Sequence, residues 1–204
     1  KISQLHTTID SIAHELNTPI TTLKFAIAQS SDTESKTLLE RQIKRLENIV
    51  SSIHTYDSDD VLINKKEVEN YFSEIKKTFD RIHFKLNIDF TENKTLSKND
   101  FQQMMNNLID NSSKYGASQI DVSVKINQLI EIEVSDNGIG IPKEEKNHIF
   151  EKYYRITRDE NLNVNGLGVG LFLVQKIVEK YKGNIEVHSK IKGVSFKINM
   201  PNEN

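Results

Sequence analysis

Hydrophobic residues near the N-terminus recur at helical spacing. They follow steps of three and four, apart from one full heptad at the end, and a stripe of this kind is typical of a coiled-coil or bundle seam. The pattern predicts an amphipathic helix over residues 1–28. Pro19 is expected to kink it, because proline cannot donate the helical hydrogen bond. The stripe consists of Ile2, Leu5, Ile9, Ile12, Leu16 and Leu23.

A second stripe of the same kind follows a short polar turn at residues 30–33. It predicts a helix over about residues 34–56 that runs antiparallel to the first. A hairpin of two helices leaves apolar surface uncovered, so we expect two copies of the chain to pair into a four-helix bundle. The second stripe consists of Leu39, Ile43, Leu46, Val50 and Ile53.

The periodicity changes after the acidic residues 57–60. Helices are predicted over residues 66–80, 98–115 and 144–151, and a further helix opens with the glycine segment 166–171 and runs through about residue 182, capped by Gly183. Alternating apolar residues predict strands over 84–90, 120–126, 130–134, 184–189 and 193–200, with a short one at 61–64. The predicted fold class is α+β, with a helical hairpin over residues 1–57 and a two-layer α/β sandwich over 58–204.

Composition narrows the function classes only slightly. The net charge of -2 gives no reason to expect nucleic acid as a partner, and the absence of cysteine excludes disulfides and thiolate nucleophiles. No apolar run reaches the roughly 20 residues that span a bilayer, and no signal peptide is visible. Because the helical stripe starts at the first residues, we expect the chain to be a fragment whose N-terminal continuation has been removed.

His14 points away from the apolar stripe of the first helix. At about 100° per residue it lies roughly 140° from Ile9 and roughly 160° from Leu16. An exposed imidazole beside Glu15, one turn before Thr18, can be oriented and deprotonated to act as a nucleophile. This stretch alone leaves open the alternative of an ordinary surface His-Glu pair.

Three polar residues, Asn107, Asn111 and Lys114, form a stripe on the flank of the apolar face of helix 98–115. Two amide oxygens beside one ammonium group suit a hydrated divalent cation and a polyphosphate. A solvated flank is the more usual meaning of such a stripe, so the stripe does not decide the function by itself. The apolar face beside it consists of Phe101, Met104, Met105, Leu108, Ile109 and Ser112.

Asp136 ends a predicted strand and is followed by Gly138 and Gly140. Glycines there would let the backbone approach a flat ligand while the carboxylate accepts a hydrogen bond from it. The alternative is an ordinary Asn-Gly turn. An Asn-rich loop over about 156–165 has the length of a lid, and the glycines of segment 166–171 open the next helix as a phosphate cradle would. The segment matches neither the Walker loop nor the dinucleotide fingerprint.

Five motifs together resemble the catalytic core of a sensor histidine kinase of two-component signalling. The resemblance covers nearly the whole chain and follows the order of the family, from a phosphoacceptor hairpin to a Bergerat-type ATP-binding domain. The motifs are the phosphoacceptor box at 14–19, the asparagine box at 107–115, the first glycine box at 136–140, the phenylalanine box at 149–155 and the second glycine box at 166–171.

The resemblance implies a role for each matching residue. His14 would accept the γ-phosphate of ATP, with Glu15 as general base, and Asp136 would accept from the adenine amino group. Thr18 matches the residue that positions a hydrolytic water in bifunctional members, so phosphatase activity toward the regulator is a further hypothesis. Mg²⁺ would be held by Asn111 with Asn107. The remaining nucleotide contacts would come from Lys114, Tyr115, Gly138, Gly140, Arg155, Gly166, Leu167, Gly168 and Gly170.

The same resemblance implies the partners and the location. We expect a homodimer through the hairpin, a receiver-domain aspartate of a response regulator as phosphate acceptor, and a cytoplasmic portion of a membrane-anchored bacterial parent. Asn17 stands where many relatives carry Lys or Arg, and Ser112 replaces the commoner alanine. Two alternatives remain, an ATP-gated conformational ATPase like the chaperone or topoisomerase relatives, and a dimerisation module with a decayed pocket.

Overall fold

The chain divides into two compact units, Lys1–Asp59 and Asp60–Asn204. The structure, a computed structural model, describes residues 61–91, 96–156, 168–190 and 192–202, and the single positions 20, 23, 27, 39 and 43. All five single positions are helical, with Ile20, Ile27 and Ile43 buried and Leu23 and Leu39 exposed. The predicted hairpin, its Pro19 kink and its pairing into a bundle lie outside the described residues.

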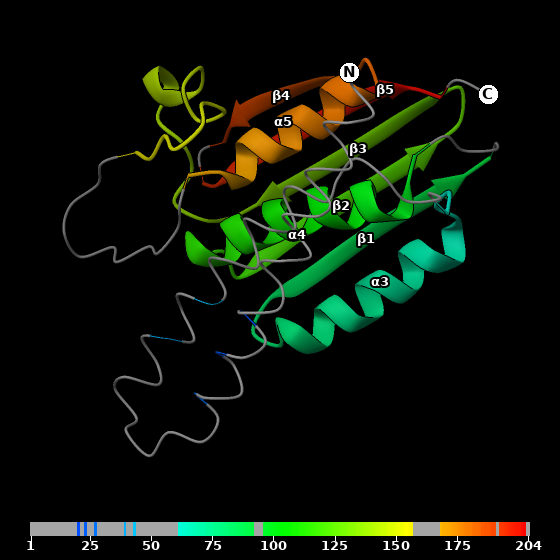
Figure 1. The fold of residues 1–204 in the computed structure, drawn as a ribbon, viewed down its shortest axis with the longest axis horizontal. Helices are drawn as coiled ribbons and strands as arrows, with labels where there is room; N and C mark the ends of the chain where they lie inside the picture. The colour runs from blue at the N-terminus through cyan, green and yellow to red at the C-terminus, as the bar shows by residue number, and fades with distance from the viewer. Residues whose placement is uncertain are drawn as a thin grey trace. The chain divides into compact units, whose positions relative to one another are not determined.

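The second unit is built on one five-stranded sheet of order β1-β2-β3-β5-β4 (Figure 1). β1 pairs parallel with β2, and the other neighbouring strands pair antiparallel. A parallel pair needs a crossover connection, which α4 supplies between β1 and β2. The five longer predicted strands are confirmed. Their bounds are β1 His83–Phe90, β2 Gln119–Ile126, β3 Leu129–Asp136, β4 Asn184–Ser189 and β5 Val194–Pro201.

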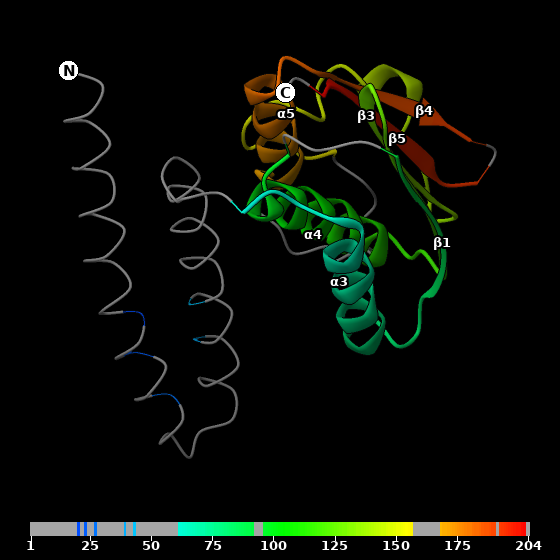
Figure 2. The ribbon, with the colours of Figure 1, turned by 90° about the vertical axis from the view of Figure 1, so that its right-hand side faces the viewer.

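Three helices, α3 (Lys65–Thr78), α4 (Lys98–Lys114) and α5 (Gly170–Lys180), cover one face of this sheet (Figure 2). α3 begins at a capping box, in which the Asn64 side chain accepts from Glu67 N at 3.0 Å and the Glu67 carboxylate accepts from Asn64 N at 3.1 Å. Ser97 caps α4 by accepting from the backbone N of Asp100 at 3.3 Å. The second unit is therefore a two-layer mixed α/β domain.

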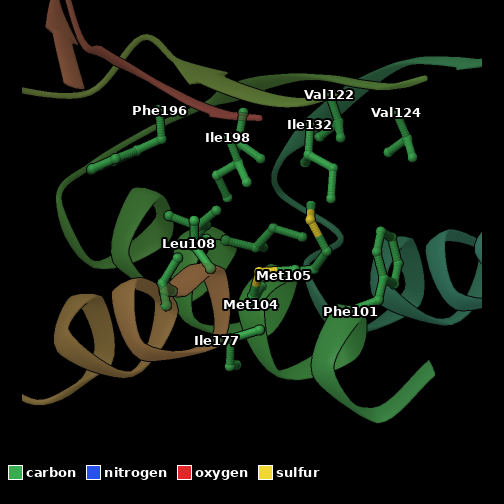
Figure 3. Close-up of a cluster of buried hydrophobic side chains, with 14 of the residues drawn as sticks. Phe101, Met104, Met105, Leu108, Val122, Val124, Ile132, Ile177, Phe196 and Ile198 are labelled. Atoms are coloured by element: carbon green, nitrogen blue, oxygen red, sulfur yellow. The ribbon is translucent and has the colours of Figure 1, made fainter. Parts of the chain in front are cut away.

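The core lies between the sheet and α4 (Figure 3). The predicted apolar face of helix 98–115 is confirmed, because all six of its members are buried. It packs against the alternate residues of the central strands that point toward the helices, while the intervening residues face the other side. The labelled strand residues in Figure 3 are Val122, Val124, Ile132, Phe196 and Ile198.

Two short predicted elements are wrong. Residues 61–64 form no strand, since Leu62 makes only an isolated bridge to Ser97 and Asn64 already caps α3. Residues 144–151 form the 3₁₀ helix η1 (Lys143–Glu145) followed by turns. The hydrogen bonds from His148 N to Glu145 O and from Glu151 N to His148 O each span three residues. A segment this short cannot offset the cost of nucleating an α-helix.

Gly183 closes α5 differently from a simple glycine cap. Lys182 takes the left-handed conformation with φ +54, and Gly183 N donates to Val178 O at 2.9 Å. These are the features of a Schellman motif. Gly183 is required for space instead, because a Cβ there would lie 2.5 Å from Met200 Cγ.

Tyr71 on α3 gives a pH-dependent test of this packing. Its hydroxyl donates to Asn106 Oδ1 at 2.8 Å, and its ring meets Phe72 and Phe101 edge to face. Burial raises the pKa of Tyr71 well above its ordinary value of 10.0. Above pH 10 the unfolded chain loses this proton while the folded chain keeps it, so stability falls as the pH rises.

We expect Tyr71→Phe to remove about 1 kcal/mol of the stability loss that the wild type shows between pH 9 and pH 11. Urea denaturation at both pH values measures it. The exposed Tyr153 supplies the control, since Tyr153→Phe should leave the wild-type pH dependence in place. Equal losses in the wild type and Tyr71→Phe would contradict the assignment.

Candidate functional site

Asp136 is the last residue of β3, and its buried carboxylate is the centre of a hydrogen-bond network. Oδ1 accepts from Gly138 N at 2.9 Å and from Val194 N at 3.3 Å. Oδ2 accepts from the Ser112 hydroxyl at 2.8 Å. An ionised carboxylate has about four acceptor positions, so one position on Oδ2 is left for a further donor.

The two predicted pocket glycines bring backbone segments together. A Cβ at Gly138 would lie 2.7 Å from Tyr115 O. Gly140 has φ +73, and a Cβ there would lie 2.9 Å from Gly193 O. Close approach of backbone was the predicted reason for these glycines, and the approach that the structure shows is to other backbone of the chain.

Asn137 joins the turn after β3 to the connection between α4 and β2. Its Oδ1 accepts from Ser118 N at 2.9 Å and from Gln119 N at 3.0 Å, and its Nδ2 donates to Ser118 Oγ at 3.0 Å. Ile139 N adds a bond to Tyr115 O at 3.2 Å. From the sequence Asn137 was predicted only as part of an Asn-Gly turn, although an asparagine side chain in a turn commonly bonds nearby backbone.

Gly193 is a site residue that was not predicted from the sequence. It lies between β4 and β5 with φ +84, and a Cβ there would fall 1.9 Å from Asp136 O. A glycine between two antiparallel strands reads as an ordinary turn residue. The backbone that it approaches belongs to another part of the chain, so no local signal could have revealed this role.

The polar stripe of α4 meets the start of α5. Asn107 Nδ2 donates to Gln103 O at 2.9 Å, and its Oδ1 would lie 2.8 Å from a Cβ at Gly170. Gly170 therefore leaves room for the Asn107 amide. The neighbouring Asn111 is half-buried, and its side chain makes no hydrogen bond to the residues that the structure describes. Both amides are thus placed on the side of α4 near the first turn of α5.

Lys114, the third member of the stripe, forms an ion pair with Asp110 one turn earlier on α4. The sequence placed Lys114 beside two amide groups, and its i, i+4 spacing to Asp110 was not used although it indicates this pair. Both side chains are partly exposed, with relative accessibilities of 37% and 49%, so this pair contributes little to stability. An incoming phosphate can compete with Asp110 for the ammonium group.

The buried carboxylate of Asp100 binds two residues at the end of α5 and so holds α5 against α4. Asp100 near the start of α4 is 2% exposed and accepts from Lys180 Nζ at 2.8 Å and from the Tyr181 hydroxyl at 2.7 Å. The end of α5 is therefore held at the start of α4, while Gly170 at the start of α5 lies at Asn107. The two helices run antiparallel, and Gly170 at the start of α5 faces the polar stripe of α4.

The phenylalanine box contacts the second glycine box. Tyr153 N donates to Gly168 O at 2.8 Å, and a Cβ at Gly168, with φ +67, would lie 2.5 Å from Tyr154 O. The Tyr154 hydroxyl donates to Glu145 of η1, and this hydrogen bond raises the pKa of Tyr154 above its ordinary value. Arg155, the predicted phosphate or sugar contact, lies exposed directly after this anchor.

The structure brings the described site residues together in two groups along α4. Asp136 lies at Ser112 and Gly138 at Tyr115, whereas Gly170 lies at Asn107. At 1.5 Å per residue, the helix separates Asn107 from Tyr115 by about 12 Å. The predicted lid loop and the site residues His14, Glu15, Thr18, Gly166 and Leu167 lie outside the described residues.

The described residues carry no group of three or more His, Cys, Asp or Glu side chains that could hold a metal ion by themselves. Asn107 and Asn111 supply amide oxygens without a local charge. Oxygen ligands of this kind suit Mg²⁺ when phosphate oxygens complete its coordination. Within the same described residues, no helix is both long enough and apolar enough to cross a membrane.

A family model described as "Histidine kinase-, DNA gyrase B-, and HSP90-like ATPase" matches residues 97–204. The signal transduction histidine-protein kinase ArlS of Staphylococcus haemolyticus is 29% identical over 213 residues, covering 93% of this chain and 47% of the relative. The sensor histidine kinase RppB of Synechocystis is 28% identical over 221 residues, again covering 93% of this chain and 47% of the relative. The chain spans about half the length of these curated relatives.

Solved structures of histidine kinases share the fold. The Acinetobacter baumannii histidine kinase AdeS aligns with a TM-score of 0.65 at 23% identity, covering 94% of this chain and 98% of that one. The mycobacterial sensor histidine kinase MprB aligns with a TM-score of 0.57 at 20% identity, covering 71% of this chain and 98% of that one.

Proposed function

The chain belongs to the histidine kinase-, DNA gyrase B- and HSP90-like ATPase family, and on that premise we propose that it is the core of a sensor histidine kinase. It transfers the γ-phosphate of ATP to His14 and then to an aspartate of a response regulator. One observation carries this proposal. The relatives named as histidine kinases align over 93% of the chain, which is more than the ATPase unit alone contains. The family match by itself would also fit a conformational ATPase.

At one end of α4 the site binds the base of ATP. Asp136 offers the one acceptor position on Oδ2 to the adenine amino group, and the backbone at Gly138 and Gly140 forms the wall beside it. Support comes from the hydrogen bonds to Ser112, Gly138 and Val194, which orient the carboxylate before any ligand arrives. Preorganisation of this kind lowers the entropy cost of binding.

Along the polar stripe of α4, from Asn107 to Lys114, the site binds the phosphates and Mg²⁺. Asn111 and Asn107 would hold the ion, which would supply positive charge to neutralise the phosphates. Lys114 exchanges its Asp110 partner for a phosphate oxygen, and Tyr115 and Arg155 line the phosphate and sugar side. The N–H groups at the start of α5 add a positive dipole end. The phosphate cradle proposed at this helix start comprises Gly166, Leu167, Gly168 and Gly170.

The first unit supplies the phosphate acceptor and the dimer interface. His14 attacks the γ-phosphorus of ATP and ADP leaves, while Glu15 takes the ring proton. Thr18 positions a water that hydrolyses the phosphorylated aspartate of the regulator to release phosphate. Leu23 and Leu39 are 42% and 41% exposed in the single chain, which supports a second copy covering them in a homodimer. The chain is proposed to work at the cytoplasmic side of a longer, membrane-anchored bacterial protein, without a nucleic-acid partner.

Incubation of the full chain with γ-labelled ATP and Mg²⁺ tests this function. We expect acid-labile, base-stable label on the wild-type protein, and incorporation about 100-fold slower in Asn111→Ala because phosphoryl transfer depends on charge neutralisation. The control Asn106→Ala makes the same change on the other side of α4, where Asn106 faces Tyr71, and should label within about twofold of wild type.

The alternatives give different results in the same experiment. Turnover of ATP without labelled protein would indicate the conformational ATPase. Absence of both label and turnover would indicate a decayed pocket. Equal labelling of Asn111→Ala and wild type would remove Asn111 from the metal site while leaving the kinase activity established.

A further inference from the structure

Ser112 is a polar residue on the otherwise apolar face of α4. It is 3% exposed, and its Oγ lies 3.1 Å from Leu108 O and 2.8 Å from Asp136 Oδ2. A serine inside a helix commonly donates to the carbonyl four residues earlier. One hydroxyl has one proton, and the shorter contact to an ionised acceptor is the stronger of the two. The Ser112 hydroxyl therefore donates its hydrogen bond to the Asp136 carboxylate.

The Asp136 carboxylate depends on Ser112 for its orientation. The two backbone donors, Gly138 N and Val194 N, both end on Oδ1. Hydrogen bonds to one oxygen restrain rotation of the carboxylate about its Cβ–Cγ bond less firmly than hydrogen bonds to both oxygens do. The Ser112 hydroxyl holds the second oxygen, Oδ2, from α4. With all three donors present, the remaining acceptor position on Oδ2 has a fixed direction.

We propose that Ser112 is a positioning residue that sets the preference of this site for a base with an exocyclic amino group. The inference rests on the proposed function, in which Asp136 accepts from adenine. A carboxylate held in one orientation accepts a hydrogen bond from an amino group. It repels a keto oxygen in the same place, because both groups are acceptors. A site built to pair with one donor rejects the analogue that lacks it. Once Ser112 no longer holds Oδ2, the carboxylate can turn away and this discrimination weakens.

Binding of ATP and of inosine triphosphate, which carries a keto oxygen in place of the adenine amino group, tests the proposal. Dissociation constants are measured by calorimetry on the full chain with Mg²⁺. We expect Ser112→Ala to weaken ATP binding about 10-fold, as removal of a hydrogen bond to a charged group does. Binding of inosine triphosphate should change less than about twofold. The ratio of the dissociation constant for inosine triphosphate to that for ATP therefore falls by most of the about 10-fold loss in ATP binding.

Two further variants separate positioning from packing. Ser113→Ala makes the same change one residue along, where the side chain makes no hydrogen bond to the described residues, and should leave both constants unchanged. Ser112→Cys keeps the shape of the side chain with a somewhat larger atom and a weak S–H donor, so its preference should lie between wild type and Ser112→Ala. It also keeps the test decisive if Ser112→Ala does not fold.

Several outcomes would overturn the inference. Equal weakening of both nucleotides by Ser112→Ala would mean that the hydroxyl only supports packing. An unchanged preference for ATP would mean that the backbone donors suffice. Failure of the wild type to bind ATP would overturn the proposed function itself, whereas ATP binding without any preference over inosine triphosphate in the wild type would overturn the adenine contact and leave the kinase assignment intact.

Discussion

Replacement of Asp136 by asparagine is expected to weaken ATP binding by at least about 1,000-fold, because the site then presents a donor where it must accept. The asparagine oxygen would take the place of Oδ1, where two backbone N–H groups point at it. Its amide N–H₂ would then face both the Ser112 hydroxyl and the incoming amino group. Calorimetric titration of the variant with ATP and Mg²⁺ measures the loss.

The same variant should reverse the base preference. The asparagine amide can donate to a keto oxygen, so we expect Asp136→Asn to bind inosine triphosphate more tightly than ATP. Asp121→Asn is the matched control, since Asp121 lies on β2 next to the inward-facing Ile120 and so points to the opposite face of the sheet. ATP binding by Asp136→Asn within tenfold of wild type would show that this carboxylate does not contact the base.

Replacement of Gly193 by alanine is expected to lower the free energy of unfolding by at least about 3 kcal/mol and to abolish measurable ATP binding. Its φ of +84 disfavours any L side chain, and its Cβ would fall 1.9 Å from Asp136 O. Relief requires a shift of the backbone that carries the Asp136 carboxylate. Urea denaturation and ATP titration measure the two effects.

Gly116 provides the control for Gly193. It has a similar φ of +79, but a Cβ there would meet nothing within 4 Å. Gly116→Ala therefore carries the conformational cost alone, about 1 kcal/mol, without the collision. If the two variants lost equal stability, the contact between Gly193 and Asp136 would have no energetic importance.

The regular elements of the second unit could be predicted from sequence because burial imposes a local period. Apolar residues at every second position predicted β1 to β5, and the apolar face of α4 followed from the helical period. The Asp136 carboxylate could be singled out for the same reason, since an acid at the end of a strand is visible in the pattern. Whether a ligand can use this carboxylate depends on the residues that face it in the folded chain.

The contacts that complete the site could not be predicted, because they join residues far apart in the chain. Val194 N and Asp136 Oδ1 are separated by 58 positions, and nothing near either residue indicates the other. The fit of Asn107 against Gly170 depends on how α5 packs on α4. Ser112 was noticed as a departure from the commoner alanine, but its partner became visible only with the sheet in place.

Identifying the phosphorylated residue tests whether this chain is a histidine kinase that uses His14 as its phosphate acceptor. The wild type, His14→Ala and His6→Ala are incubated with γ-labelled ATP and Mg²⁺, His6 being a second histidine of the predicted first helix. We expect acid-labile label on the wild type and on His6→Ala, and none on His14→Ala. Label that persists on His14→Ala would contradict the assignment of His14 as the acceptor of the γ-phosphate.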